Sequence, residues 1–315
     1  MNNKMWINLV HLGSNMWNEE GNLRGRGEER SNRDASPVLR FDRALWDKYM
    51  LYQKEKGIDT LVIDIGEAMK YESHPELMVE GSWTHDMMHE EIKKLNAMGF
   101  KVIPKLNFSA CHDIWLKDYS RMLSTKPYYQ VCKDVISEVL EVFKPEYFHL
   151  GMDEETPQNQ RNFNHISVRM GELWWHDLYY LVDIVEKAGA QAIVWSDYCW
   201  AKPEEYVSKM PKSVIQNTWY YHDQFSGDVG DYWRPGLQAF ELLDKNGFVQ
   251  IPAGSIFFNK ENMLGLTKYC TENLEDSRIK GYMQTVWERI ADGWMHLQYG
   301  AADELEKAKK WYESR

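Results

Sequence analysis

Three acidic residues close together follow a short apolar stretch in the middle of the chain. Residues 147–150 read Tyr-Phe-His-Leu, and Gly151 and a methionine separate them from Asp153, Glu154 and Glu155. Acidic side chains are almost never fully buried without partners, so this run at the end of a buried strand indicates a place that needs carboxylates. Paired carboxylates can act as general acid and base, and carboxylates also ligate metal ions. The alternative is an acidic loop, or the first turn of a helix, where acids interact favourably with the helix dipole.

The elements that would position these acids alternate regularly along the chain. Apolar and β-branched runs predict strands, and stretches of helical period predict helices between them. The predicted strands are residues 5–11, 60–65, 101–106, 147–150, 192–195, 214–218, 249–257 and 281–286. The predicted helices cover about residues 43–56, 86–98, 127–143, 168–187, from 203 onward, 235–246, 261–273 and 301–312.

Strict alternation of this kind implies a parallel sheet. Eight repeats within 315 residues predict an α/β fold, a single (β/α)8 TIM barrel spanning residues 1–315, with long loops after the first three strands. The structural alternative is an open doubly wound sheet. That fold would need a glycine-rich phosphate loop after an early strand, and the sequence has none in that context.

The composition limits the classes of partner. The net charge is -11, which argues against nucleic acid and against an anionic membrane surface as main partners. The sequence has no apolar run of the roughly 18 residues that a transmembrane helix needs, and its start lacks a signal-peptide core. The four cysteines show no CxxC spacing, so we expect no zinc knuckle and a reduced, cytoplasmic protein. The sequence gives no indication of oligomeric state.

The residues after the predicted strands are rich in aromatic and acidic side chains. In a barrel, the chemistry lies at the carboxyl ends of the strands. The candidates there are His11, Trp17, Asp64, Glu67, Asn107, His112, Asp153, Glu154, Glu155, Trp195, Asp197, Tyr198, Trp219, Tyr220, Tyr221, Asp223, Phe257, Phe258, Asn259, Trp287, Glu288 and Arg289. With 14 Trp and 18 Tyr in the chain, one explanation is a large aromatic core, and the other is a ligand pocket.

Aromatic rings stack on the apolar faces of sugars, and paired carboxylates supply the acid and base of glycoside hydrolysis. A metal site would favour groupings such as HExxH, whereas the ten histidines are scattered. We therefore expect a carbohydrate substrate, no metal and no cofactor.

Several of these strand-end motifs resemble those of glycoside hydrolase family 20, the β-N-acetylhexosaminidases. Residues 149–154, His-Leu-Gly-Met-Asp-Glu, are similar to the family signature His-Leu/Ile-Gly-Gly-Asp-Glu. Residues 71–83 resemble the family's "YPEL…G" loop, and residues 102–112 resemble its "VIPE…PGH" segment. Three tryptophans in the same order along the chain resemble those after the family's strands 5, 6 and 8: Trp195, Trp219 and Trp287.

The resemblance implies an exo-acting, retaining glycosidase whose substrate assists the reaction through its own 2-acetamido group. It makes Glu154 the general acid and then the base, with a raised pKa, and leaves Asp153 ionised to orient the acetamido N–H. The three tryptophans would wall the sugar pocket. His112 would support the acids, and the alternative for His112 is a structural histidine. The implied substrate is an oligosaccharide or glycoconjugate with a terminal β-linked amino sugar.

Some positions depart from the family pattern. Met152 stands where the signature has its second glycine, which predicts a bulkier turn and a reshaped sugar site. Ala110 and Cys111 replace the first two residues of "PGH". The family's strand 1 arginine has no counterpart, and Arg24 or Arg26 of the following loop could substitute for it.

The sugar-binding set after strand 7 is also altered. The family's Tyr-x-Asp motif reads Phe-Phe-Asn at residues 257–259, which leaves Asn259 as the candidate there. Tyr221 and Asp223 keep the same spacing after strand 6, so they could take over. Glu288 is a further substrate-binding candidate, although it directly follows Trp287 instead of standing two residues on.

Two other functions stay open. One is a retaining glycosidase of different sugar specificity, with Glu154 as acid and a carboxylate such as Glu288 as nucleophile; a carboxyl separation of about 5 Å would favour it. The other is a non-catalytic sugar-binding barrel, since fold alone does not establish catalysis.

Overall fold

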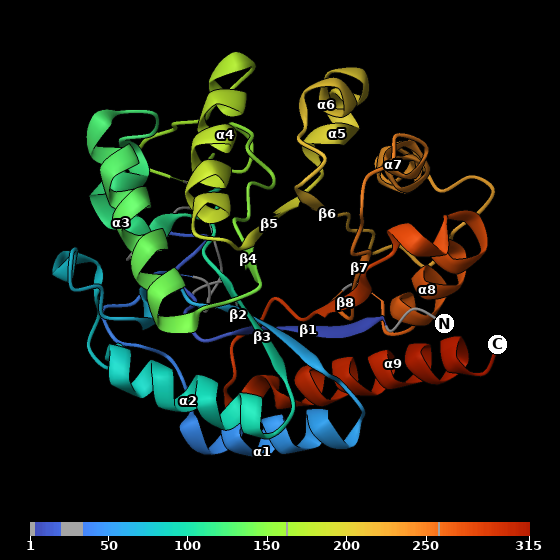
Figure 1. The fold of residues 1–315 in the computed structure, drawn as a ribbon, viewed down its shortest axis with the longest axis horizontal. Coiled ribbons are helices and arrows are strands. Elements are labelled where there is room, and N and C mark those ends of the chain that lie inside the picture. The colour runs from blue at the N-terminus through green and yellow to red at the C-terminus, as the bar shows by residue number, and fades with distance from the viewer. Residues whose placement is uncertain (1–3, 20–33, 162, 258) are drawn as a thin grey trace.

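Eight parallel strands form one sheet in the computed structural model of the protein, which describes residues 4–19, 34–161, 163–257 and 259–315 (Figure 1). Their order in the sheet is β6-β5-β4-β3-β2-β1-β8-β7, so each strand follows its neighbour in sequence around the ring. The strands are β1 Met5–His11, β2 Thr60–Asp64, β3 Lys101–Lys105, β4 Tyr147–His149, β5 Gln191–Trp195, β6 Ile215–Asn217, β7 Ala253–Ser255 and β8 Gly281–Thr285.

The ring is nearly closed between β6 and β7. These two strands meet through isolated parallel bridges, Gln216 with Gln250 and Trp219 with Ala253, instead of a continuous ladder. The amide N–H of Ile251 donates to the carbonyl of Gln216 at 2.9 Å, and that of Tyr220 donates to the carbonyl of Ala253 at 3.0 Å. The predicted TIM-barrel fold is therefore confirmed.

Helices separate successive strands and cover the outside of the barrel (Figure 1). The α-helices are α1 Arg43–Glu55, α2 His85–Ala97, α3 Lys126–Phe143, α4 Glu172–Lys187, α5 Tyr198–Ala201, α6 Pro203–Lys209, α7 Arg234–Lys245, α8 Asn262–Asn273 and α9 Met295–Glu313. Side-chain caps fix several of their starts. Asp42 accepts a hydrogen bond from Leu45 N, and Thr84 accepts one from Met87 N. Such caps satisfy amide groups that the first helical turn leaves without partners.

The strands are buried on both faces, which explains their continuous apolar runs. In β1, Trp6 and Val10 pack into the large core between sheet and helices, while Ile7 and Leu9 pack inside the barrel. This alternation turns the last residue, His11, toward the barrel interior at the carboxyl end.

Some boundaries differ from the predicted ones. The strand predicted over residues 249–257 is only Ala253–Ser255, because the chain before it contacts its neighbours through isolated bridges. The helix predicted from residue 168 begins at Glu172, after Gly171 with a φ of 56°. The last helix begins at Met295 instead of residue 301.

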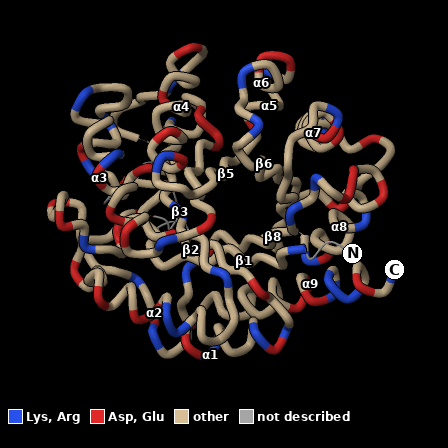
Figure 2. The backbone as a smooth tube through the Cα atoms, in the orientation of Figure 1, with Lys and Arg blue, Asp and Glu red and all other residues tan. Residues whose placement is uncertain are grey.

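Acidic and basic residues are interspersed along the outer helices, as Figure 2 shows. Within the described residues, no helix combines the length and the apolar character that crossing a bilayer would require. All four cysteines are buried and free.

Candidate active site

The acidic run lies on an unusual backbone segment at the end of β4. Gly151, Met152 and Glu154 have φ values of 73°, 75° and 54°, a region that non-glycine residues rarely adopt. A Cβ atom on Gly151 would lie 2.1 Å from Asn107 Oδ1, so this position needs glycine for space as well as for conformation. The side chain of Met152 is buried in the core between sheet and helices and does not line the cavity described below. The Met152 side chain, which we predicted would reshape the sugar site, therefore lies outside the cavity.

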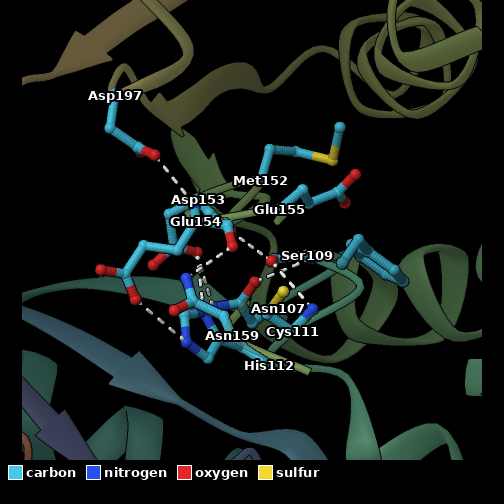
Figure 3. Close-up of polar contacts among 12 residues, drawn as sticks. Asn107, Ser109, Cys111, His112, Met152, Asp153, Glu154, Glu155, Asn159 and Asp197 are labelled. Carbon is cyan, nitrogen blue, oxygen red and sulfur yellow. Dashed lines mark hydrogen bonds and ion pairs between the residues drawn. The ribbon is translucent and has the colours of Figure 1, made fainter. Parts of the chain in front are cut away.

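Asp153 and Glu154 are bridged by one histidine (Figure 3). His112 Nδ1 lies 3.2 Å from Asp153 Oδ1, and His112 Nε2 lies 3.5 Å from Glu154 Oε2. Asn107 Nδ2 also donates to Asp153 Oδ1 at 3.2 Å. The Asp153 side chain is 8% exposed and that of Glu154 is 38% exposed, so the first is enclosed and the second reaches the opening.

The charges of this network follow from its contacts. Burial alone would lower the pKa of His112, but Asp153 and Glu154 outweigh it and raise that pKa to about 9. Burial alone would raise the pKa of Asp153, but His112, Lys105 and Asn107 together lower it to about 2. At neutral pH, an imidazolium therefore lies against an ionised Asp153.

Asp197, at the end of β5, adds a second contact to the acid pair. Its Oδ2 accepts a hydrogen bond from the Glu154 backbone N–H at 2.9 Å, and its Oδ1 accepts one from the indole N–H of Trp219 at 3.4 Å. Burial, followed by the charge of Asp153, raises the pKa of Asp197 to about 7.

A layer of polar side chains lies at the ends of four neighbouring strands. His11 pairs in register with Asp64, Asp64 with Lys105, and Lys105 with His149. Lys105 and Asp64 form a fully buried ion pair. His149 accepts a hydrogen bond from Gly151 N at 3.0 Å, and burial lowers its pKa to about 3, so it is a neutral structural residue.

An aromatic cavity of about 340 Å³ opens above the acids. Trp287 donates its indole N–H to the Tyr221 hydroxyl at 3.2 Å, which ties the walls from β8 and β6 together. The cavity is lined by Trp17, His112, Asp153, Glu154, Trp195, Trp219, Tyr221, Tyr232, Trp233, Phe257 and Trp287. Seven of the ten predicted site residues therefore meet in one place, three of them tryptophans from separate strand ends.

The other three predicted site residues do not line this cavity. Glu288 is buried, and its backbone carbonyl accepts from Gln298 Nε2 at 2.8 Å. Asp223 is 63% exposed beside His222. Asn259 Oδ1 accepts from the Glu261 N–H just before α8. Trp287, directly before Glu288, has a φ of 59°, so the chain leaves the extended conformation of β8 there and the strand alternation does not continue to Glu288.

Some predictions fall outside the described residues. They concern Arg24 and Arg26, proposed to replace the strand 1 arginine, and Phe258 of the Phe-Phe-Asn motif.

The cavity also contains residues that the sequence did not single out. Tyr232 and Trp233 come from the long segment between β6 and α7. The signal available was an adjacent aromatic pair in a polar stretch, but no strand end marked it. Trp17 also lines the cavity and was a strand-end candidate without an assigned role. Asp197 was another such candidate, and it contacts the site without lining the cavity.

Glu155, the third acid of the run, has a structural role. Its carboxylate forms an ion pair with the fully buried Arg169, and Oε1 accepts from Ala110 N at 2.9 Å. It holds the loop after β3, which carries His112, against the loop after β4.

The same geometry bears on metal binding. His112, Asp153 and Glu154 each offer an atom such that the three lie within 4.8 Å of one another. Both ring nitrogens of His112 already face carboxylates, and a protonated imidazole has no lone pair for a metal. The donor set therefore fits an ion-pair network better than a metal centre.

Comparison with known proteins agrees with this site. Residues 110–229, which contain His112, both acids and two of the tryptophans, match the family model described as glycosyl hydrolase family 20, catalytic domain. The predicted resemblance to family 20 is confirmed. No curated protein matches the chain.

Solved structures of family 20 enzymes share the fold of this chain. One is a β-N-acetylhexosaminidase from Bacteroides fragilis, with a TM-score of 0.63, 12% identity, and coverage of 99% of this chain and 71% of that one. Another is an exo-β-N-acetylglucosaminidase from Vibrio harveyi in complex with N-acetylglucosamine, with a TM-score of 0.63, 12% identity, and coverage of 96% and 54%. A third is a mutant β-hexosaminidase from Streptomyces plicatus in complex with product GlcNAc, with a TM-score of 0.61, 12% identity, and coverage of 95% and 62%. The chain thus spans about half to less than three quarters of these proteins.

Proposed function

We propose that this protein is an exo-acting glycoside hydrolase that removes terminal β-linked N-acetylhexosamine with retention of configuration. The observation that carries the proposal is the pair Asp153 and Glu154, joined by His112 at the floor of a tryptophan-walled cavity. The relatives crystallised with N-acetylglucosamine support an amino sugar as substrate.

In the first step, the acetamido oxygen of the substrate attacks the anomeric carbon while Glu154 gives its proton to the leaving oxygen. The bond between the anomeric carbon and that oxygen breaks, and an oxazolinium-like ring forms. Asp153, held ionised by His112, accepts the acetamido N–H and stabilises the positive charge of the ring. In the second step, Glu154 takes a proton from water, which attacks the anomeric carbon and opens the ring.

Tyr221 is one of two tyrosines among the described residues that line the cavity, and its hydroxyl would hold the acetamido oxygen. Its oxygen already accepts from the Trp287 indole, which fixes the direction in which the phenol lies. Tyr221 would take the role suggested by its spacing after strand 6, whereas Asp223, which is 63% exposed, would not share it.

The alternative with Glu288 as direct nucleophile has less support, because Glu288 does not line the cavity. Substrate choice separates the two mechanisms. A direct nucleophile needs no acetamido group, whereas the assisted reaction depends on one.

The test uses aryl β-glycosides of GlcNAc, GalNAc and glucose with the wild type and Glu154→Gln. We expect turnover of the N-acetyl sugars and loss of about 10²-fold or more in kcat in the variant. Turnover confined to the glucoside would refute substrate assistance. Sugar binding without turnover by the wild type would identify a binding protein instead of an enzyme.

A further inference from the structure

The backbone of the proposed acid is held in a conformation that it would not adopt by itself. Glu154 has a φ of 54°, and such conformations cost on the order of 1–3 kcal/mol for a non-glycine residue. Its carbonyl accepts from Asn159 Nδ2 at 2.9 Å and from Thr156 N at 2.8 Å. Its N–H donates to Asp197 Oδ2 at 2.9 Å. Both sides of the residue are therefore tied down, and Asp197 is the contact that comes from a different strand end (Figure 3).

The second oxygen of Asp197 reaches the sugar pocket wall. Its hydrogen bond with the Trp219 indole links β5 to the residue that follows β6. Trp219 and Glu154 both line the cavity. One carboxylate therefore fixes the acid and a stacking surface relative to each other.

The local helix does not account for this arrangement. Asp197 is the N-cap residue of α5, a place where Asp normally accepts from the first helical N–H groups. Here its side chain makes no capping hydrogen bond. Asp197 has helical backbone angles, φ -66° and ψ -19°, and both of its oxygens accept hydrogen bonds within the site.

We propose that Asp197 is a positioning residue for the hydrolysis. By binding both the Glu154 backbone N–H and the Trp219 indole, Asp197 keeps the Glu154 carboxyl within reach of the leaving oxygen of a sugar stacked on Trp219. This inference rests on the proposed function, because it assigns Asp197 a role through the acid Glu154. Small displacements of a catalytic group, of about 1 Å, can cost on the order of 10²-fold in rate.

Leaving-group dependence tests the role. In a disaccharide with a β-linked terminal GlcNAc, the leaving oxygen needs a proton from the acid. In a 2,4-dinitrophenyl glycoside, the dinitrophenolate leaves as a stable anion and needs no proton. We expect Asp197→Ala to lower kcat on the disaccharide by about 10²-fold and on the dinitrophenyl substrate by less than about 5-fold. Asp197→Asn keeps one acceptor oxygen and can hold only one of the two N–H groups, so its loss should be intermediate.

Asp59→Asn is the matched control. Asp59 Oδ1 also accepts a backbone N–H across strands, from Trp6 at 3.0 Å, but it lies directly before β2, at the amino end of the strand. This variant should change the rates on both substrates by the same factor. Circular dichroism and thermal melting show which variants fold, and Asp197→Asn remains informative if Asp197→Ala does not.

The outcomes separate the two proposals. The positioning role is refuted if Asp197→Asn and Asp197→Ala lower kcat on both substrates by the same factor, as expected for the Asp59 variant. It is also refuted if they change kcat on neither substrate. If Glu154→Gln retains full activity on the disaccharide, Glu154 is not the acid, and the proposed function is refuted independently of the Asp197 variants. If the wild type turns over neither substrate, both proposals are refuted.

Discussion

His112 is the residue that sets the charge state of the candidate site. It faces Asp153 through one ring nitrogen and Glu154 through the other. Two carboxylates this close repel each other when both are ionised, and an imidazolium between them removes much of that cost. The sequence left the role of His112 open between a supporting and a structural group. The structure makes it the bridge between the two acids.

This bridge predicts a loss of stability at alkaline pH. The pKa of His112 rises from 6.5 to about 9 on folding. Its contribution is therefore complete below pH 6.5 and is lost as the pH rises through about 9. We expect the protonated His112 to contribute about 3 kcal/mol to the free energy of unfolding below pH 6.5. The His112→Gln variant should lack this contribution at every pH.

Urea unfolding of the wild type and of His112→Gln between pH 6 and about 10 measures the contribution of His112 to stability. The quantity to follow is the difference between the two proteins, because the carboxyls of Asp113 and Asp197, with pKa values of about 7, titrate in the same range. A difference that stays constant with pH would contradict this account of His112.

At the element scale, the end of β4 shows how the fold positions the acids. Gly151 brings the chain against Asn107 at the end of β3, and Asn107 in turn donates to Asp153. The sequence predicted the strand, the turn and the acids from an apolar run that stops at a glycine. It did not predict that Met152 would adopt the same left-handed conformation and bury its side chain in the core, because a side chain's direction after a turn depends on the backbone angles.

Gly151→Ala should therefore destabilise the protein and disturb the site together. The new methyl group would meet Asn107 at 2.1 Å, in addition to the strain at a φ of 73°. We expect a loss of about 2–4 kcal/mol in the free energy of unfolding and a lower kcat.

Gly189→Ala is the control, since Gly189 has a φ of 87° and no atom of the described residues lies within 4 Å of an added Cβ. It should cost about 1–2 kcal/mol through conformation alone and leave kcat unchanged. Equal effects of the two substitutions in denaturant unfolding would show that the contact with Asn107 is unimportant.

At the scale of the whole molecule, the barrel was predictable and the details of its mouth were only partly so. Eight strands buried on both faces leave a clear apolar pattern, and parallel strands place their carboxyl ends at one mouth. This logic brought Trp195, Trp219 and Trp287 to one cavity with the acids. It did not find Tyr232 and Trp233, because the segment between β6 and α7 has no period from which to read a direction.

The same reasoning included residues that do not line the cavity at the ends of β6 and β8. Trp219 and Tyr221 face the barrel interior while Tyr220 between them packs in the outer core. Trp287 lines the cavity, and Glu288, one residue on, does not. Position after a strand thus narrows the candidates, and the alternation of side chains selects among the residues after β6. After β8, Trp287 has a φ of 59°, so alternation alone does not decide which way Glu288 points.

In the proposed mechanism, the acetamido group of the substrate is the nucleophile, Asp153 orients it and Glu154 is the acid. Progressive fluorination of that group withdraws electrons and weakens its oxygen as a nucleophile in steps, with only a gradual increase in size. Measuring kcat/KM for 4-nitrophenyl β-glycosides with mono-, di- and trifluoroacetamido groups should show a steady fall of on the order of 10²-fold or more across the series. Equal kcat/KM values across the series would contradict substrate assistance and point to a carboxylate nucleophile.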